Sequence, residues 1–131
     1  MKGVNYASAS AGIQPETGVQ VGMRISMDQQ LRNHQTIVSK IGNSFGQNST
    51  AYLNRCLYSV YVGSNDWMLN YFGGGSLRFP YTPQAYADTL LNQLSQQLTV
   101  SSITSSFFSP HSLFFFLGLI KLLIFTKCLE V

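Results

Sequence analysis

The amino-acid composition of the chain changes abruptly near Thr99, and this break limits the folds that the whole chain can form. Residues 1–98 hold all eight asparagines, all seven tyrosines and ten of the eleven glycines. Residues 99–131 hold six of the nine phenylalanines and contain no Asn, Gln, Tyr or Asp. A single fold rarely changes its composition so completely at one point. We therefore expect a folded body over residues 1–98 and a separate hydrophobic tail over residues 99–131.

Charge is scarce and spread along the sequence. Only 10% of the 131 residues are charged, compared with about 25% in typical soluble domains. This excludes an acidic disordered segment, a coiled coil and a nucleic-acid-binding arm, which all need dense charge. Eight Lys and Arg residues against five Asp and Glu residues give a formal net charge of +3. The basic residues form no cluster, so we expect no nucleic-acid partner.

Metal-ligating and disulfide-forming residues are few. Cys56, Cys128, His34 and His111 are the only cysteines and histidines, which is too few for a disulfide framework or a typical zinc site. Cys56 stands in an apolar run and is typical of a buried small hydrophobe. We expect neither a metal nor another cofactor.

Hydrophobic periodicity and breaker residues predict an incomplete α/β pattern in the body. Ser26 and Gln29 have the spacing of a capping box, and Thr82-Pro83 supplies a helix cap followed by a proline at the first helical position. At most two strands are visible, which is too few for a complete parallel sheet. The expected elements are, in order, a strand at 3–7, a turn at 14–18, a helix at 27–42, a short helix at 50–55, a buried parallel strand at 57–62, a flexible loop at 73–76 and a helix at 83–98.

Small and polar residues follow both expected strands. The first strand ends in Ala7-Ser8-Ala9, and the second ends in Gly63-Ser64-Asn65-Asp66. In open α/β sheets, ligands bind beyond the carboxyl ends of the strands. A side-chain amide from one loop and a backbone N–H from the other can converge on one oxygen, as an oxyanion hole requires. The same residues are also typical of two ordinary turns that follow strands.

Longer motifs around these loops resemble one enzyme family. The resemblance runs in order from about Gly3 to Leu98, with family-like spacing. The motifs are Gly3-Val4-Asn5-Tyr6-Ala7-Ser8-Ala9-Ser10-Ala11-Gly12-Ile13, Ile25-Ser26-Met27-Asp28-Gln29-Gln30-Leu31, Tyr58-Ser59-Val60-Tyr61-Val62-Gly63-Ser64-Asn65-Asp66-Trp67, Asn70-Tyr71-Phe72 and Tyr81-Thr82-Pro83-Gln84-Ala85-Tyr86-Ala87. Together they resemble the plant GDSL-type esterase/lipases of the SGNH hydrolase superfamily.

This resemblance implies a partial three-layer α/β/α flavodoxin-like fold, truncated at both ends, from an enzyme that hydrolyses carboxylic esters. It assigns Asn65 as the side-chain donor to the oxyanion. It assigns the backbone N–H of Ala9, where many relatives have Gly, as the second donor; Ala keeps this donor if its φ is negative. Gly63, Asp66 and Gly12 would support the loops and take no part in proton transfer. The substrates implied are lipid or other acyl esters, and the family is typically secreted.

Two motifs that carry the family's proton transfer do not occur in the sequence. The nucleophilic serine of the family lies in a Gly-Asp-Ser-like block, and the paired Asp and His lie in an Asp-x-x-His block. His34 lies on an apolar helical stripe and His111 in the tail, so neither is expected to serve as the base. We therefore expect the chain alone to be inactive. The first residues carry no signal-peptide pattern, which leaves the localisation of the chain open.

The tail has no counterpart in the resemblance. Residues 113–125 are thirteen mostly apolar residues interrupted by Lys121, whereas a membrane-spanning helix needs about 20. The Phe, Ser and Leu bias is typical of a translated pyrimidine-rich non-coding stretch, such as a retained intron or mis-predicted exon. The alternative is a non-catalytic membrane-associated or interaction protein that uses the tail as its anchor. We expect the tail not to pack against the body.

Overall fold

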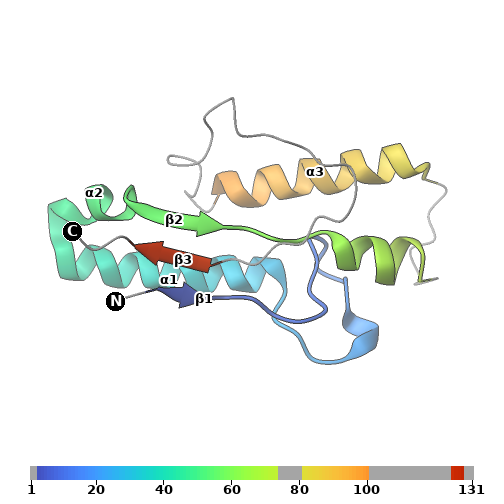
Figure 1. The fold of residues 1–131 in the computed structure, drawn as a ribbon, viewed down its shortest axis with the longest axis horizontal. Helices are drawn as coiled ribbons and strands as arrows, with labels where there is room; N and C mark the ends of the chain where they lie inside the picture. Colours follow the sequence, from blue (N-terminus) through green and yellow to red (C-terminus); the bar gives the residue numbers. More distant parts are fainter. Residues whose placement is uncertain (1–2, 74–80, 101–124, 129–131) are drawn as a thin grey trace.

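Two long helices run alongside a short sheet in the computed structural model, which describes residues 3–73, 81–100 and 125–128 (Figure 1). The helices are α1 (Met27–Phe45) and α3 (Pro83–Val100). The sheet has three strands in the order β1-β3-β2. The strands are β1 (Val4–Asn5), β2 (Cys56–Ser59) and β3 (Phe125–Cys128).

The central strand β3 comes from the tail and runs antiparallel to both neighbours. Its Thr126 lies opposite Val4 of β1 on one side and Tyr58 of β2 on the other. Because β1 and β2 are both antiparallel to β3, they run in the same direction. Two expectations are wrong here. The strand expected to be parallel at 57–62 pairs with β3 in the antiparallel sense, because its neighbour in the sheet is a strand of the tail. The tail was expected not to pack against the body, but its residues 125–128 pair with both β1 and β2.

Helix α1 begins where the sequence predicts and ends later. The Ser26 side chain accepts a hydrogen bond from Gln29 N at 3.4 Å, which confirms the cap. The Gln29 side chain does not complete a capping box; it bonds Asn33 and Arg32 instead. The helix continues through Gly42, which was expected to end it, and stops at Gly46, whose φ of 54° breaks the helical geometry.

The remaining helices agree in part with the sequence. Thr82 caps α3 by accepting from Ala85 N at 3.2 Å, and α3 extends through Val100, past the expected boundary near residue 98. The short helix α2 (Ser49–Leu53) lies close to its expected place. The π-helix η3 (Asp66–Tyr71) lies where the sequence predicted no regular element. Two 3₁₀ turns, η1 (Val19–Val21) and η2 (Gly46–Asn48), complete the described elements.

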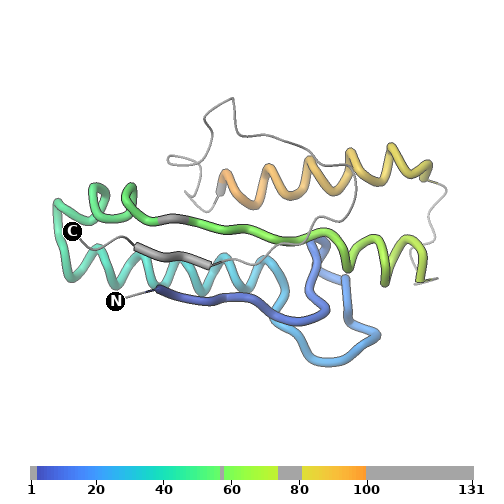
Figure 2. Tube along the Cα trace, in the orientation of Figure 1, coloured from blue at the N-terminus to red at the C-terminus, as the bar shows by residue number. Residues whose placement is uncertain are grey.

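Two hydrophobic clusters hold the helices to the strands. The first comprises Tyr6, Met27, Leu31, Cys56 and Tyr58, and the second comprises Ile13, Val62, Tyr86 and Leu90. Leu94 of α3 packs against both clusters and so joins them. Figure 2 shows the chain continuing from β2 through an extended segment into η3. The polar loops lie beside this second cluster.

Cys56 is buried, as its apolar surroundings suggest, but it is disulfide-bonded in the structure. The register of β2 and β3 places Cys128 opposite it. Most of the apolar run at 113–125, and residues 74–76 of the expected flexible loop, lie outside the described residues. Within the described ranges, no helix is both long and apolar enough to cross a membrane.

Candidate functional site

Asn65 and the loop of residues 8–12 lie together although they are far apart in the sequence. Asn65 ends the segment that follows β2 and caps η3. Its Nδ2 donates a hydrogen bond of 2.8 Å to the backbone oxygen of Ala11. An amide NH₂ group has two hydrogens, so this bond orients the side chain and leaves a second N–H for another acceptor. Asn65 is half-buried, which keeps that N–H near the surface.

Ala9 stands in a tight turn from Ser8 to Ala11. Ala11 N donates to Ser8 O at 3.4 Å, and Ser10 has a φ of +62°. Ser10 is the only non-glycine residue with positive φ in the described part of the chain, so Ala9 has a negative φ. An alanine therefore fits here without backbone strain. Among the described residues nothing accepts a hydrogen bond from the exposed N–H of Ala9.

Asp66 binds the turn that follows this loop. Its side chain is 0% exposed and accepts hydrogen bonds from Ile13 N at 2.9 Å and Gln14 N at 3.0 Å. It also accepts a bond from the Thr17 hydroxyl at 2.7 Å. Burial raises the pKa of the Asp66 carboxyl above its ordinary value, while these three hydrogen bonds act in the opposite direction. The geometry makes Asp66 a structural acceptor for one turn.

Two glycines allow these close approaches. A Cβ at Gly12 would collide with the Asp66 carboxylate and with Cγ2 of Thr17, so only glycine lets the backbone reach Asp66. Gly63 has a φ of 110°, which lets the chain turn from the extended segment into η3. Both glycines therefore shape the backbone on either side of Asn65.

Sequence reasoning missed a second layer of polar residues behind Asp66. Asn70 Nδ2 donates to Thr17 Oγ1 at 2.7 Å and to Gln14 Oε1 at 3.3 Å. The Tyr86 hydroxyl of α3 lies 3.0 Å from Gln14 Oε1 and 3.1 Å from Asp66 O. Burial and the Asp66 charge raise the pKa of Tyr86 to about 12. The turn at 14–18 and the motifs that contain Asn70 and Tyr86 were visible in the sequence, but none of them indicated that these residues meet.

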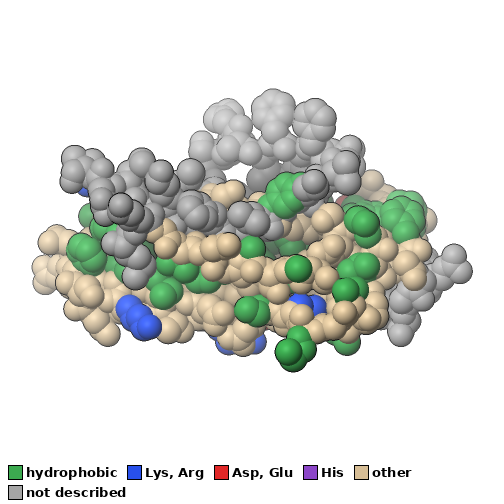
Figure 3. Space-filling view, turned by 60° about the horizontal axis from the view of Figure 1, so that its bottom comes forward, with side chains coloured by type: hydrophobic (Ala, Val, Ile, Leu, Met, Phe, Trp, Pro, Cys, Tyr) green, Lys and Arg blue, Asp and Glu red, His purple; other side chains and the backbone are tan. Residues whose placement is uncertain are grey.

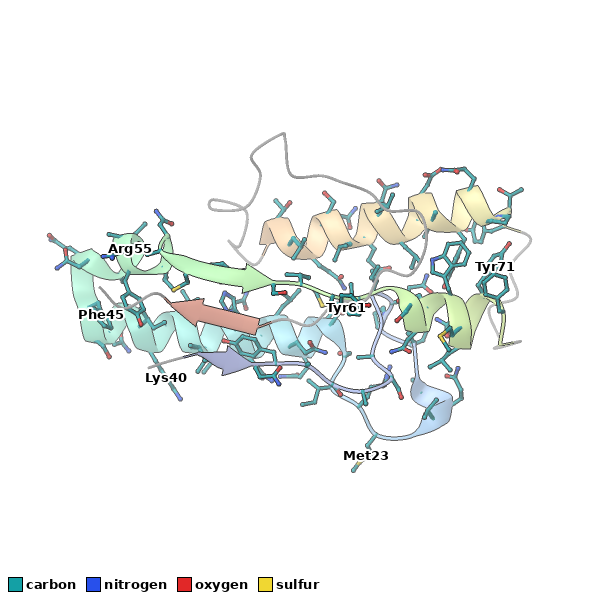
Figure 4. The ribbon with its side chains drawn as sticks, viewed as in Figure 1. Met23, Lys40, Phe45, Arg55, Tyr61 and Tyr71 are labelled. Atoms are coloured by element: carbon teal, nitrogen blue, oxygen red, sulfur yellow. The ribbon has the colours of Figure 1, made fainter. Side chains whose placement is uncertain are left out.

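Aromatic rings pack around the far side of this network. The Tyr86 ring lies 5.1 Å from Trp67 and 5.0 Å from Tyr71, between centroids. Figure 4 shows Tyr71 where η3 approaches the start of α3, whereas Met23 points away from the body. These rings bury the polar layer and fix η3 against α3.

His34 takes no part in this site. It is buried against Tyr6, with 3.3 Å between His34 Nδ1 and the Tyr6 hydroxyl, and its ring makes edge contacts with Tyr6 and Tyr58. Burial lowers the pKa of His34 below 6.5. His111 lies outside the described residues. Within the described ranges, no group of His, Cys, Asp and Glu residues could hold a metal ion. Figure 3 shows only separate Lys and Arg side chains on the face it presents.

Curated proteins of known sequence extend these observations. The chain is 49% identical to the GDSL esterase/lipase At1g29670 of Arabidopsis thaliana over 102 residues, which cover 75% of this chain and 28% of the relative. It is 45% identical to At4g18970 over 107 residues and 46% identical to At1g29660 over 102 residues, two more GDSL esterase/lipases of that plant. Over the matched residues, the chain is similar to GDSL esterase/lipases.

This similarity covers one segment of longer proteins. The chain spans just over a quarter of the length of the GDSL relatives, 28% and 29% for the first two. No protein-family model and no solved structure matches the chain. The family assignment therefore rests on the curated relatives, and it agrees with the motifs found in residues 3–98.

Proposed function

We propose that this chain supplies the oxyanion-binding part of a GDSL esterase/lipase that hydrolyses carboxylic esters of lipid or other acyl substrates. The observation that carries the proposal is the contact between Asn65 and the loop of residues 8–12. This contact supports an arrangement in which the Asn65 amide and the backbone N–H of Ala9 would donate to one shared acceptor. The names of the relatives, esterase/lipases, support the reaction class.

The chemistry follows from the donors. When a nucleophile attacks an ester carbonyl, negative charge develops on the carbonyl oxygen. The free N–H of Asn65 and the N–H of Ala9 would donate hydrogen bonds to that oxygen and stabilise the charge in the transition state. Gly12, Gly63 and Asp66 would hold the two donors in place. None of these three would transfer a proton.

The fold proposed for this segment is part of the three-layer α/β/α arrangement of the SGNH hydrolases. The common direction of β1 and β2 supports this placement, as do the helices that follow each strand. In such a sheet the two polar loops lie at one edge, where ligands bind. The antiparallel β3 departs from that arrangement.

We further propose that residues 1–131 alone do not form an acyl-enzyme. An activated serine needs a base within hydrogen-bond distance, and His34 is buried against Tyr6. Incubation of the purified chain with a fluorophosphonate probe should label no serine, as mass spectrometry of the intact chain would report. Stoichiometric labelling of one serine would contradict this.

A segment exchange tests the proposed function. Residues 3–98 would replace the matched segment of the Arabidopsis relative At1g29670, after that relative has been shown to hydrolyse a p-nitrophenyl ester. We expect the hybrid to fold and to hydrolyse the same ester, because the exchanged segment would bring both oxyanion donors. A hybrid with native-like circular dichroism and thermal unfolding but no hydrolysis would contradict the proposal.

A further inference from the structure

The turn of residues 12–17 is held almost entirely by side chains from other parts of the chain. Asp66 of η3 binds the N–H groups of Ile13 and Gln14. Gln97 of α3 donates to the backbone oxygen of Ile13 at 3.0 Å. Arg24 donates to backbone oxygens of the same turn. A turn held from three directions has little freedom to move relative to η3.

The Thr17 hydroxyl connects the turn to η3 through two hydrogen bonds. It donates its single hydrogen to Asp66 Oδ1 at 2.7 Å and accepts from Asn70 Nδ2 at 2.7 Å. Both bonds fix its orientation, and both partners belong to η3. Thr17 is itself 0% exposed. Loss of the hydroxyl would remove one of the two hydrogen bonds that Asp66 Oδ1 accepts and one of the two that Asn70 Nδ2 donates, inside a buried site.

Tyr86 connects the same network to α3. Its hydroxyl contacts Gln14 Oε1, which also accepts from Asn70. Gln14, Asn70 and Tyr86 are all buried, so their amide and hydroxyl groups have little contact with bulk water. Buried networks of this kind specify one arrangement when every member is satisfied.

We infer that Thr17, Asn70 and Tyr86 are positioning residues, which set the place of Asn65 relative to the Ser8–Ala11 turn by holding Asp66 against residues 12–17. Asp66 follows Asn65 directly, and Ile13 lies two residues after Ala11. The hydrogen bond that Ile13 N donates to Asp66 Oδ2 therefore ties together the backbone segments that carry both candidate oxyanion donors. That this positioning serves catalysis rests on the proposed function. That the three residues position Asn65 rests on the hydrogen bonds alone.

The test uses the full 131-residue chain, labelled with ¹⁵N. The side-chain NH₂ signals of Asn65 are assigned by their loss in Asn65→Asp. Thr17→Val keeps the shape of the side chain and removes the hydroxyl, and Tyr86→Phe removes only its hydroxyl. In each variant, we expect the Asn65 NH₂ signals to shift and solvent exchange of the hydrogen bonded to Ala11 O to accelerate at least about tenfold, equivalent to about 1.4 kcal/mol.

Matched variants separate positioning from general loosening. Thr17→Ser keeps the hydroxyl and should restore exchange to within about twofold of the original chain. Thr36→Val makes the same chemical change on the exposed face of α1, where Thr36 bonds only its own helix, and should leave the Asn65 signals unchanged. Tyr52→Phe is the corresponding control for Tyr86→Phe.

Unchanged Asn65 signals and exchange in a folded Thr17→Val and a folded Tyr86→Phe would overturn the inference. If Thr17→Val does not fold, Tyr86→Phe decides alone. A different result would contradict the proposed function. If the segment exchange folds but does not hydrolyse the ester, the proposed function is wrong, whereas the effect of Thr17 and Tyr86 on the Asn65 signals would still support the positioning role.

Discussion

Asp66 illustrates how one residue acts through its place in the fold. Its motif position beside Asn65 indicated loop support, but the sequence did not identify what it supports. The partners Ile13, Gln14 and Thr17 lie 49 to 53 residues away in the chain. Such partners depend on the tertiary path of the backbone, so no local pattern could name them.

Asp66→Asn should destabilise the chain by about 1–3 kcal/mol. In the original chain both carboxylate oxygens of Asp66 accept hydrogen bonds from backbone N–H groups. The amide NH₂ of asparagine would face one of these N–H groups and could not accept its hydrogen bond.

The pKa of Asp66 is raised in the folded chain, so the folded carboxyl keeps its proton to higher pH than the unfolded one. Its contribution to stability therefore decreases as pH rises from about 3.8 through the folded pKa. Urea unfolding between pH 3.5 and 7 should show this slope in the original chain.

Asp88→Asn is the matched control for that substitution. Asp88 is exposed on α3 and bonds only the side chain of Gln84. Its substitution should change stability by less than about 0.5 kcal/mol. Equal unfolding free energies for Asp66→Asn and Asp88→Asn would contradict the role given to Asp66.

His34 should give the chain an acid sensitivity of the opposite sign. Burial lowers its pKa below 6.5 in the folded chain. Below that pH the unfolded chain binds a proton that the folded chain excludes, so stability falls as pH drops. The facing hydroxyls of Tyr6 and Tyr58 stay neutral, because burial raises their pKa values. We expect urea unfolding to show a larger loss of unfolding free energy from pH 7.5 to 5.5 in the original chain than in His34→Gln. Equal losses in the two chains would contradict this role of His34.

At the scale of elements, local signals predicted the long helices and missed the short irregular one. Helices α1 and α3 follow from hydrophobic spacing and from the caps at Ser26 and Thr82, which are properties of neighbouring residues. The π-helix η3 depends on distant packing, since Asp66 and Asn70 are buried against residues 13–17 and Tyr86 packs over Trp67. The sequence therefore located the start of the site at Asn65 but not the element that follows it.

Gly42 in α1 and Gly46 at its C-cap should respond to the same substitution with opposite sign. Gly42 lies inside the helix, and nothing lies within 4 Å of a Cβ placed on it. Gly42→Ala should therefore stabilise the chain by about 0.5–1 kcal/mol. Gly46 ends the helix with a φ of 54° and a ψ of −128°, a conformation that an L-residue rarely adopts, so Gly46→Ala should destabilise it. The midpoints of thermal unfolding of both variants test this prediction. A higher midpoint for Gly46→Ala as well as for Gly42→Ala would contradict the claim that the backbone conformation at residue 46 requires glycine.

At the scale of the whole molecule, composition did not predict that part of the tail pairs with the body. Helix α3 ends at Val100, close to the composition break near residue 99, but β3 lies between β1 and β2. Composition records which residues occur but not which strands pair, so it could not predict this contact. The origin of the remaining tail stays a prediction, because residues 101–124 lie outside the described part of the chain.

Removal of β3 should lower the stability of the body. Deletion of residues 125–131 leaves β1 and β2 without the strand that bonds both, whereas deletion of residues 129–131 keeps β3. Urea unfolding should be compared with reductant present, so that the disulfide at Cys56 does not contribute to the difference. The longer deletion should unfold at clearly lower urea. Identical midpoints for the two deletions would show that β3 contributes nothing to the body.

The central claim is that Asn65 stabilises the oxyanion of a GDSL esterase/lipase. The most direct measurement is kcat for ester hydrolysis by the segment exchange with At1g29670, with and without Asn65→Ala. Removal of one oxyanion donor should lower kcat by about 10²–10³-fold with little change in KM. Asn92→Ala, on the exposed face of α3, should leave kcat unchanged. An Asn65→Ala variant that folds and keeps its full kcat would contradict the account.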